Sequence, residues 1–206
     1  MLFRSTAGKF SADYQFDGTI RNPLIKGRAD LANGAIAVPQ AGINVSNVSL
    51  SINSSDANII NLKGEGESGK GKMGFIGQIE FESEKNIKTS IELSGEDFEI
   101  VNLPEVHAFI SPSLQLFTAN RRADLVGVLA IPEAVITLKD ISDTVTVSDD
   151  VVVVGETDEQ EEKWAFYSSV RLELGDKVMF SGFDVTGNIT GAVVAVDEPY
   201  KTTTGF

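Results

Sequence analysis

A pattern of ten residues that occurs twice constrains this chain more than any other feature. Residues 34–43 read GAIAVPQAGI and residues 127–136 read GVLAIPEAVI, so both follow Gly-x-Ile/Leu-Ala-Val/Ile-Pro-x-Ala-x-Ile. In each copy a period-two apolar rhythm reaches the proline and resumes after the alanine, which predicts a strand, a kink and a second strand. Because proline has no N–H to complete a ladder of hydrogen bonds, we expect each proline at a kink or a sheet edge.

The same alternation of apolar and polar residues runs through most of the sequence. Residues 9–16, 73–81 and 87–93 each place their apolar side chains on one side of an extended strand. A phase slip after Val45 predicts a bulge. No convincing amphipathic helix interrupts the strands, so the predicted class is all-β, with an elongated, curved and antiparallel-rich sheet. We expect antiparallel pairing because the connections are too short for crossovers.

Several segments carry local predictions of their own. Glu105–Ile110 could form one helical turn, and Gly175–Lys177 is expected to turn the chain back. The β-branched residues of Val145–Val154 predict strand, and Glu156–Lys163 reads as a charged hairpin loop. The C-terminal end stops in mid-pattern, which predicts that residues 1–206 are a single β segment of a larger protein.

Composition and charge exclude several classes of partner. Thirty acidic residues against seventeen basic ones give a formal net charge of -13. A chain with this charge repels phosphate backbones, so nucleic acid is not an expected partner. Cysteine is absent, which removes disulfides and cysteine-based metal sites. The N-terminal residues lack the pattern of a signal peptide, and no apolar run is long enough to span a membrane as a helix.

The candidate catalytic and metal-binding motifs are all weak. Residues 64–70 match the start of a phosphate-binding loop, but Gly71 replaces the required Ser or Thr and a strand pattern follows, so a hairpin is predicted. His107 is the single histidine and is expected to be an isolated surface or loop residue. The acidic residues within 149–162 match no calcium loop and are expected in solvated turns. We therefore predict no enzyme activity, no metal and no cofactor.

Two interpretations of the one-sided strands remain open at this level. The apolar faces could press together in a closed β-sandwich, which would suit a structural or adhesive domain with no lipid ligand. Alternatively, one long sheet could form an open trough with an apolar interior that a ligand fills. Periodicity does not separate these two folds.

Over nearly its whole length the chain resembles the periplasmic part of TamB, within the AsmA-like group of bridge-like lipid transport proteins. The N-terminal part resembles an earlier family repeat, and Asp184 stands where the family pattern leads us to expect glycine. The motifs that carry the resemblance are Pro39–Ile43 with Val45, Val48 and Leu50, then Gly64, Ser68, Gly69 and Gly71, then Ser111–Leu114, Gly127–Ala134, Val147–Val154, Val170–Val178, Gly182 and Val185–Gly191.

The resemblance implies a β-taco, an elongated curved sheet with an apolar interior. It implies a location in the periplasm, with an inner-membrane anchor helix outside this segment. The implied partners are phospholipid acyl chains and, through the full-length protein, an Omp85-type outer-membrane barrel such as TamA. The implied roles are conduction of phospholipid between the inner and outer membranes and support of outer-membrane protein assembly.

The alternating pattern also predicts which side chains would line a lipid groove. They are apolar, similar to one another in polarity and placed on the apolar side of their strands. These residues are Ile36, Val38, Leu50, Phe75, Ile79, Leu114, Leu116, Leu129, Ile131, Leu172, Leu174, Val178 and Phe180.

Overall fold

The structure is a computed structural model, and it describes residues 4–19, 22–56, 58–83, 86–138 and 164–197. The predicted strand at 145–154, the predicted loop at 156–163 and the acidic candidates at 149–162 lie outside the described residues. Among the residues described, no helix is long and apolar enough to cross a membrane.

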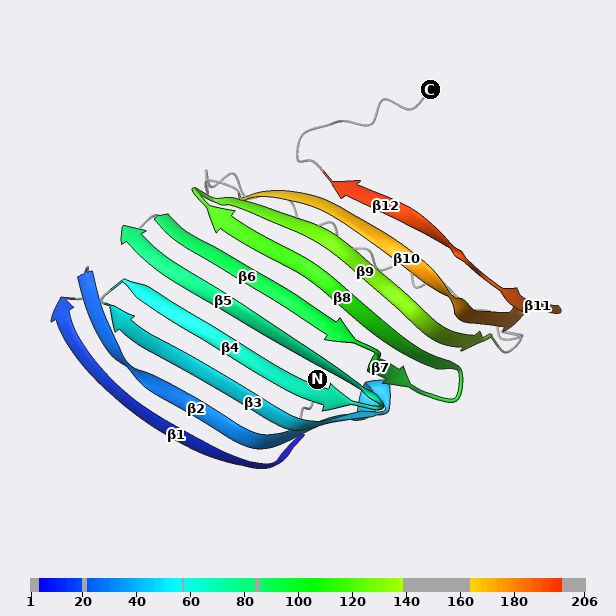
Figure 1. The fold of residues 1–206 in the computed structure, drawn as a ribbon, viewed down its shortest axis with the longest axis horizontal. Helices are drawn as coiled ribbons and strands as arrows, with labels where there is room; N and C mark the ends of the chain where they lie inside the picture. The colour runs from blue at the N-terminus through cyan, green and yellow to red at the C-terminus, as the bar shows by residue number, and fades with distance from the viewer. Residues whose placement is uncertain (1–3, 20–21, 57, 84–85, 139–163, 198–206) are drawn as a thin grey trace, which may run out of the picture.

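All described strands belong to one sheet, in the order β1-β2-β3-β4-β5-β6-β8-β9-β10-β11 (Figure 1). The short β7 pairs with β8 beyond the end of β6, and β12 pairs with β10 beside β11. The all-β prediction is confirmed. The strands are β1 Arg4–Thr19, β2 Asn22–Val38, β3 Ile43–Asp56, β4 Ile59–Ser68, β5 Gly71–Ser83, β6 Asn86–Glu96, β7 Phe98–Asn102, β8 Val106–Ala119, β9 Arg122–Thr137, β10 Ala165–Gly182, β11 Val185–Asn188 and β12 Gly191–Asp197.

The sheet is open and curved rather than closed. Figure 1 shows β1 at one side of the sheet and β12 at the opposite side, and no ladder joins them. The chain exposes 15162 Å² of surface, whereas a compact monomer of this mass would expose about 9,300 Å². Only a few described apolar residues are buried, and they are Ala29, Ile43, Phe98, Ala108, Phe109, Ala134 and Val178. The closed β-sandwich is therefore excluded.

The prediction of an antiparallel-rich sheet is confirmed, with one pair of strands as the exception. β10 runs parallel to β9, with Ala165 opposite Arg122 and Leu172 opposite Leu129, while every other pair of described strands is antiparallel. A parallel pair needs a crossover that returns to the starting end of the sheet. Residues 138–164 separate these two strands, which is long enough for such a return. The sequence prediction divided this segment into short hairpins and so missed the crossover.

The two copies of the repeated pattern adopt different structures. In the first copy, Pro39 begins a one-turn 3-10 helix over Pro39–Ala41, and Gly42 follows with φ 67, so the chain reverses into β3 instead of kinking. The prediction of a kinked strand is therefore wrong at this site. In the second copy, β9 continues through Pro132. The pairing register of β9 shifts around this residue toward both neighbouring strands, β8 and β10. Here the predicted interruption of the ladder is confirmed.

Other local predictions have mixed outcomes. The bulge after Val45 is confirmed by a register shift between Ser46 and Ser49, and the hairpin predicted at 64–71 is the β4–β5 hairpin. The helical turn predicted at Glu105–Ile110 is wrong, because β8 begins at Val106. The turn predicted at Gly175–Lys177 is also wrong, because β10 passes through these residues with a bulge opposite Pro132.

Candidate functional site: the apolar face of the sheet

The register of the strands aligns apolar residues and glycines into a row that crosses the sheet. Residues paired directly across a ladder lie on the same face. One unbroken row runs over ten strands and contains Phe10, Leu31, Leu50, Gly64, Phe75, Leu93, Leu114, Gly127, Val170 and Ala195. At the usual strand spacing this row is about 43 Å long. It marks one apolar face of the sheet, which we call the apolar face.

A second row lies beside the first on the apolar face. It contains Ala12, Ala29, Ile52, Leu62, Gly77, Ile91, Leu116 and Leu125. Because two parallel rows of apolar groups are continuous over eight strands, the face offers apolar contact along the whole width of the sheet and not at one spot.

The register places the predicted groove residues on this face. Leu50, Phe75 and Leu114 belong to the first row, and Leu116 belongs to the second. Further along the ladders are the pairs Ile36–Val45, Val38–Ile43, Ile79–Thr89, Leu129–Leu172, Ile131–Leu174, Ala134–Val178 and Ile136–Phe180. Among the predicted residues Val178 is buried, with 4% exposure, and the others are half-buried. That they contact lipid remains a prediction.

The prediction omitted several residues that the rows bring onto the same face. They include Leu31, Ile52, Leu62, Ile91, Leu93, Leu125 and Val170. All of them except Leu31, which precedes Ala32, and Leu125, which precedes Val126, have a polar residue on each side in the sequence, so the signal that identified the other residues was also present here.

Exposure of the apolar face increases toward the two edges of the sheet. In the central strands the side chains of this face are half-buried by one another. Near the edges, Phe10 on β1 is 68% exposed and Val193 on β12 is 65% exposed. A contiguous exposed apolar surface of this kind is uncommon on a soluble monomer, which makes this face the candidate binding site.

Charged side chains lie on the opposite face, which we call the polar face. Arg28 pairs with Asp30 and Arg122 with Asp124, in each case two residues apart along one strand. The Arg122 side chain donates a hydrogen bond to Asp124, and this lowers the pKa of that carboxyl group. None of the positions assigned to the apolar face in the described strands β3 to β9 carries a charge.

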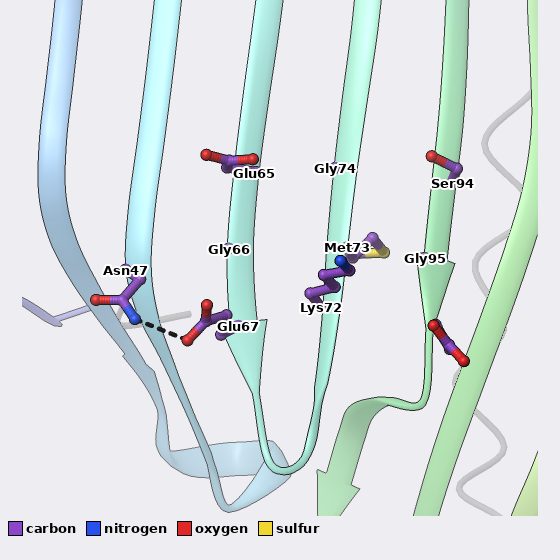
Figure 2. Close-up of a pocket in the computed structure, with 10 residues that line it drawn as sticks. Asn47, Glu65, Gly66, Glu67, Lys72, Met73, Gly74, Ser94 and Gly95 are labelled. Carbon is purple, nitrogen blue, oxygen red and sulfur yellow. Dashed lines mark hydrogen bonds between the residues drawn. The ribbon is translucent and has the colours of Figure 1, made fainter.

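The polar face also contains shallow hollows. One of them, of about 500 Å³, lies across β3 to β6, and its lining includes Glu65, Glu67 and Lys72 (Figure 2). The amide nitrogen of Asn47 donates to Glu67 Oε2 at 2.7 Å. The lining of this hollow combines acidic, basic, amide and hydroxyl groups, so the hollow does not suit an acyl chain.

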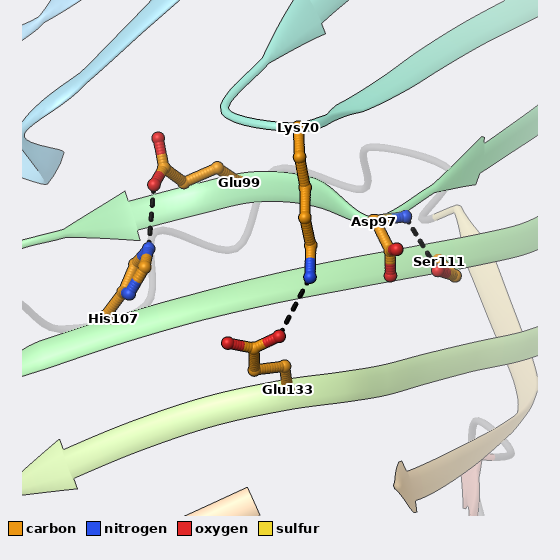
Figure 3. A network of polar contacts seen from close by, with 6 residues as sticks. All are labelled: Lys70, Asp97, Glu99, His107, Ser111 and Glu133. Atoms are coloured by element: carbon orange, nitrogen blue, oxygen red, sulfur yellow. Dashed lines mark hydrogen bonds and ion pairs between the residues drawn. The ribbon is translucent and has the colours of Figure 1, made fainter. Parts of the chain in front are cut away.

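Polar contacts join the β4–β5 hairpin to β8 and β9, and others join β7 to β8 (Figure 3). Lys70 Nζ donates to Glu133 Oε2 at 2.8 Å and lies 4.5 Å from the ring centre of Phe109. The hydrogen bond from Lys70 lowers the pKa of Glu133. The hairpin can approach β7 this closely because Gly69 has no side chain, and a methyl group there would lie 2.8 Å from Cβ of Glu99.

The contacts between β7 and β8 correct the prediction for His107. His107 lies on β8, and its Nε2 is 2.7 Å from Oε1 of Glu99 on β7, so it is not isolated. Glu99 also accepts a hydrogen bond from the Asn102 amide. No local pattern indicates this pairing, because Glu99 lies eight residues before His107, on a separate strand across the turn between β7 and β8. Among the described residues no group of acidic or histidine side chains could hold a metal ion.

These features define the class of the protein as an open, curved all-β sheet with one continuous apolar face. Comparison with family models then identifies the family, because residues 56–204 match the TamB C-terminal domain. The chain therefore belongs to the TamB family, a family of non-enzymatic transport and assembly modules of the cell envelope. No curated protein and no solved structure matches the chain.

Proposed function

We propose that the apolar face conducts phospholipids by holding their acyl chains while the head groups stay in water. The general roles of the TamB family are lipid transport and outer-membrane assembly. The observation that supports lipid conduction in this chain is the unbroken row of apolar residues and glycines over ten strands. It matches the elongated shape of an acyl chain better than it matches a compact ligand.

The energetics favour such a surface as a route for lipid. Exposing an acyl chain to water costs ~0.8 kcal/mol per methylene, so a tail of about 16 carbons would face a barrier of roughly 12 kcal/mol. An apolar face that covers the tail along its route removes most of this barrier. Because successive positions of the rows are uniformly apolar, no position binds the tail much more tightly than the next, and the lipid can slide.

The wider setting of this activity is part of the proposal. We infer that the segment works in the periplasm, in a protein anchored in the inner membrane by a helix outside these residues. In that setting the sheet would carry phospholipid between the inner and outer membranes and support outer-membrane protein assembly together with an Omp85-type barrel. The carrier is passive, so the direction of transport is set elsewhere.

Neighbouring residues on opposite faces allow a direct test. Leu93 lies on the apolar face and Glu92 lies on the polar face of the same strand, β6. A photo-crosslinking amino acid at each position is incubated with phospholipid vesicles and irradiated. We expect a lipid adduct in the mass spectrum of the Leu93 variant and little or none in that of the Glu92 variant. Equal labelling at both positions, or none at Leu93, would contradict lipid binding by the apolar face.

A further inference from the structure

One glycine on the apolar face has an aromatic ring packed over it. Gly64 on β4 is directly opposite Phe75 on β5 and, on its other side, opposite Leu50 on β3. A methyl group at Gly64 would lie 2.5 Å from Cε1 and 2.8 Å from Cζ of Phe75. The ring therefore occupies the space that any other residue at position 64 would need.

This contact determines how the Phe75 ring lies on the sheet. Side chains of a strand normally stand roughly perpendicular to the sheet. Over Gly64 the ring of Phe75 instead lies against the backbone of the neighbouring strand, in the gap between Phe75 and Leu50. The first row is consequently shallow at Gly64, although its neighbour Phe75 has one of the largest apolar side chains of the apolar face.

Two other glycines of β4 and β5 on the apolar face do not have this role. Gly66 is covered by the methyl groups of Val45 and Val48, and Gly77 lies against Ile91, so small aliphatic groups fill these sites. A planar ring reaches further above the sheet when it stands upright than when it leans over, whereas these methyl groups change little in height. Gly27 is also covered by the ring of its paired residue, Tyr14, with Cδ1 2.6 Å from the position of a methyl group, but that pair joins β1 and β2 at the edge of the sheet and lies outside the first row.

We propose that the packing of Phe75 on Gly64 sets the free depth of the apolar face and thereby determines which acyl chains it admits. This inference depends on the proposed lipid conduction. A cis double bond bends an acyl chain and widens its path, whereas a trans double bond leaves the chain nearly straight. With the ring held flat, the face has room for the bent chain. With the ring forced upright, bent chains are excluded first.

The test changes the glycine and follows lipid selectivity. The full chain and its Gly64→Ala variant are incubated separately with vesicles of dioleoyl phosphatidylcholine and of dielaidoyl phosphatidylcholine, which differ only in the cis or trans geometry of the double bond. Bound lipid is counted by native mass spectrometry. We expect Gly64→Ala to lower uptake of the cis lipid about tenfold, which corresponds to the loss of apolar contact by about two methylene groups. Uptake of the trans lipid should fall much less.

Two further variants separate selectivity from a general effect on folding. Adding Phe75→Leu to Gly64→Ala removes the displaced ring and should restore uptake of the cis lipid. Ile76→Ala changes a residue of the polar face that follows Phe75 in sequence and is 53% exposed, so it should leave uptake of both lipids unchanged. If Gly64→Ala fails to fold by circular dichroism, Phe75→Leu alone still tests the idea, since it should raise the ratio of cis to trans lipid.

The outcomes distinguish this inference from the proposed function. If the unchanged protein takes up neither lipid, lipid conduction itself fails. If it takes up both, and both Gly64→Ala and Phe75→Leu leave the ratio of cis to trans lipid unchanged, the role of Phe75 and Gly64 is overturned while lipid conduction stands.

Discussion

At the scale of single residues, charged side chains stabilise the fold where strands from distant parts of the chain meet. Lys70 and Glu133 are 63 residues apart in sequence, and their hydrogen bond links the β4–β5 hairpin to β9. Most other ion pairs among the described residues join residues two apart on one strand, such as Arg171 and Glu173. Such local pairs do not hold separate elements together, and exposed pairs contribute little to stability.

The lowered pKa of Glu133 predicts a pH dependence of stability. The hydrogen bond from Lys70 favours the ionised carboxylate in the folded state, so its contribution is complete above the ordinary value of 4.5 and is lost as the pH falls through the lowered pKa. We expect Glu133→Gln to reduce the fall in the urea midpoint between about pH 4.5 and lower values. The same substitution in a Lys70→Met background should change nothing further. An unaltered pH profile in Glu133→Gln would contradict this role.

At the scale of elements, the alternation of apolar and polar residues predicted the positions of the strands well, but it predicted less well which strands pair with one another. Local patterns of apolar residues and turn residues define where β3, β5 or β8 can run. The parallel partner of β9 depends on a crossover, and the pairing of Glu99 with His107 depends on β7 meeting β8 across a turn. These contacts join segments whose local sequence is compatible with several partners. The two proline motifs show the same limit, because similar sequences give a reversal at Pro39 and a continuous strand with an interrupted ladder at Pro132.

Val178 on β10 and Val193 on β12 both belong to the apolar face, but the first is buried and the second is exposed. Val178 is buried with Ala108 and Ala134, whereas Val193 on β12 is 65% exposed. An aspartate at position 178 would be a buried charge without a partner, so Val178→Asp should lower the free energy of unfolding by about 3 kcal/mol or more. Val193→Asp should change it by less than about 0.5 kcal/mol. Urea unfolding of both variants measures the difference, and similar losses in the two would show that the β12 side of the face is covered.

At the scale of the whole molecule, the sheet leaves an unusual amount of apolar surface in water even when it is folded. The heat capacity change of unfolding arises mainly from apolar surface that becomes exposed. A compact domain of this length would give about 2.5–3 kcal/mol/K. We expect the lipid-free protein to give a clearly smaller value by differential scanning calorimetry, and the value should rise when phospholipid is bound. A value in the range for compact domains without lipid would indicate that the apolar face is covered.

The single parallel pair has a consequence for the order in which the sheet can form. From β1 to β6 each strand pairs with the next one along the chain, so these ladders need only short loops to close. β10 can pair with β9 only after the chain has returned along the full length of that strand. Contacts that close long loops form more slowly than local ones. We therefore expect β1 to β9 to pair first and to present the edge of β9 as the template to which β10, β11 and β12 are added.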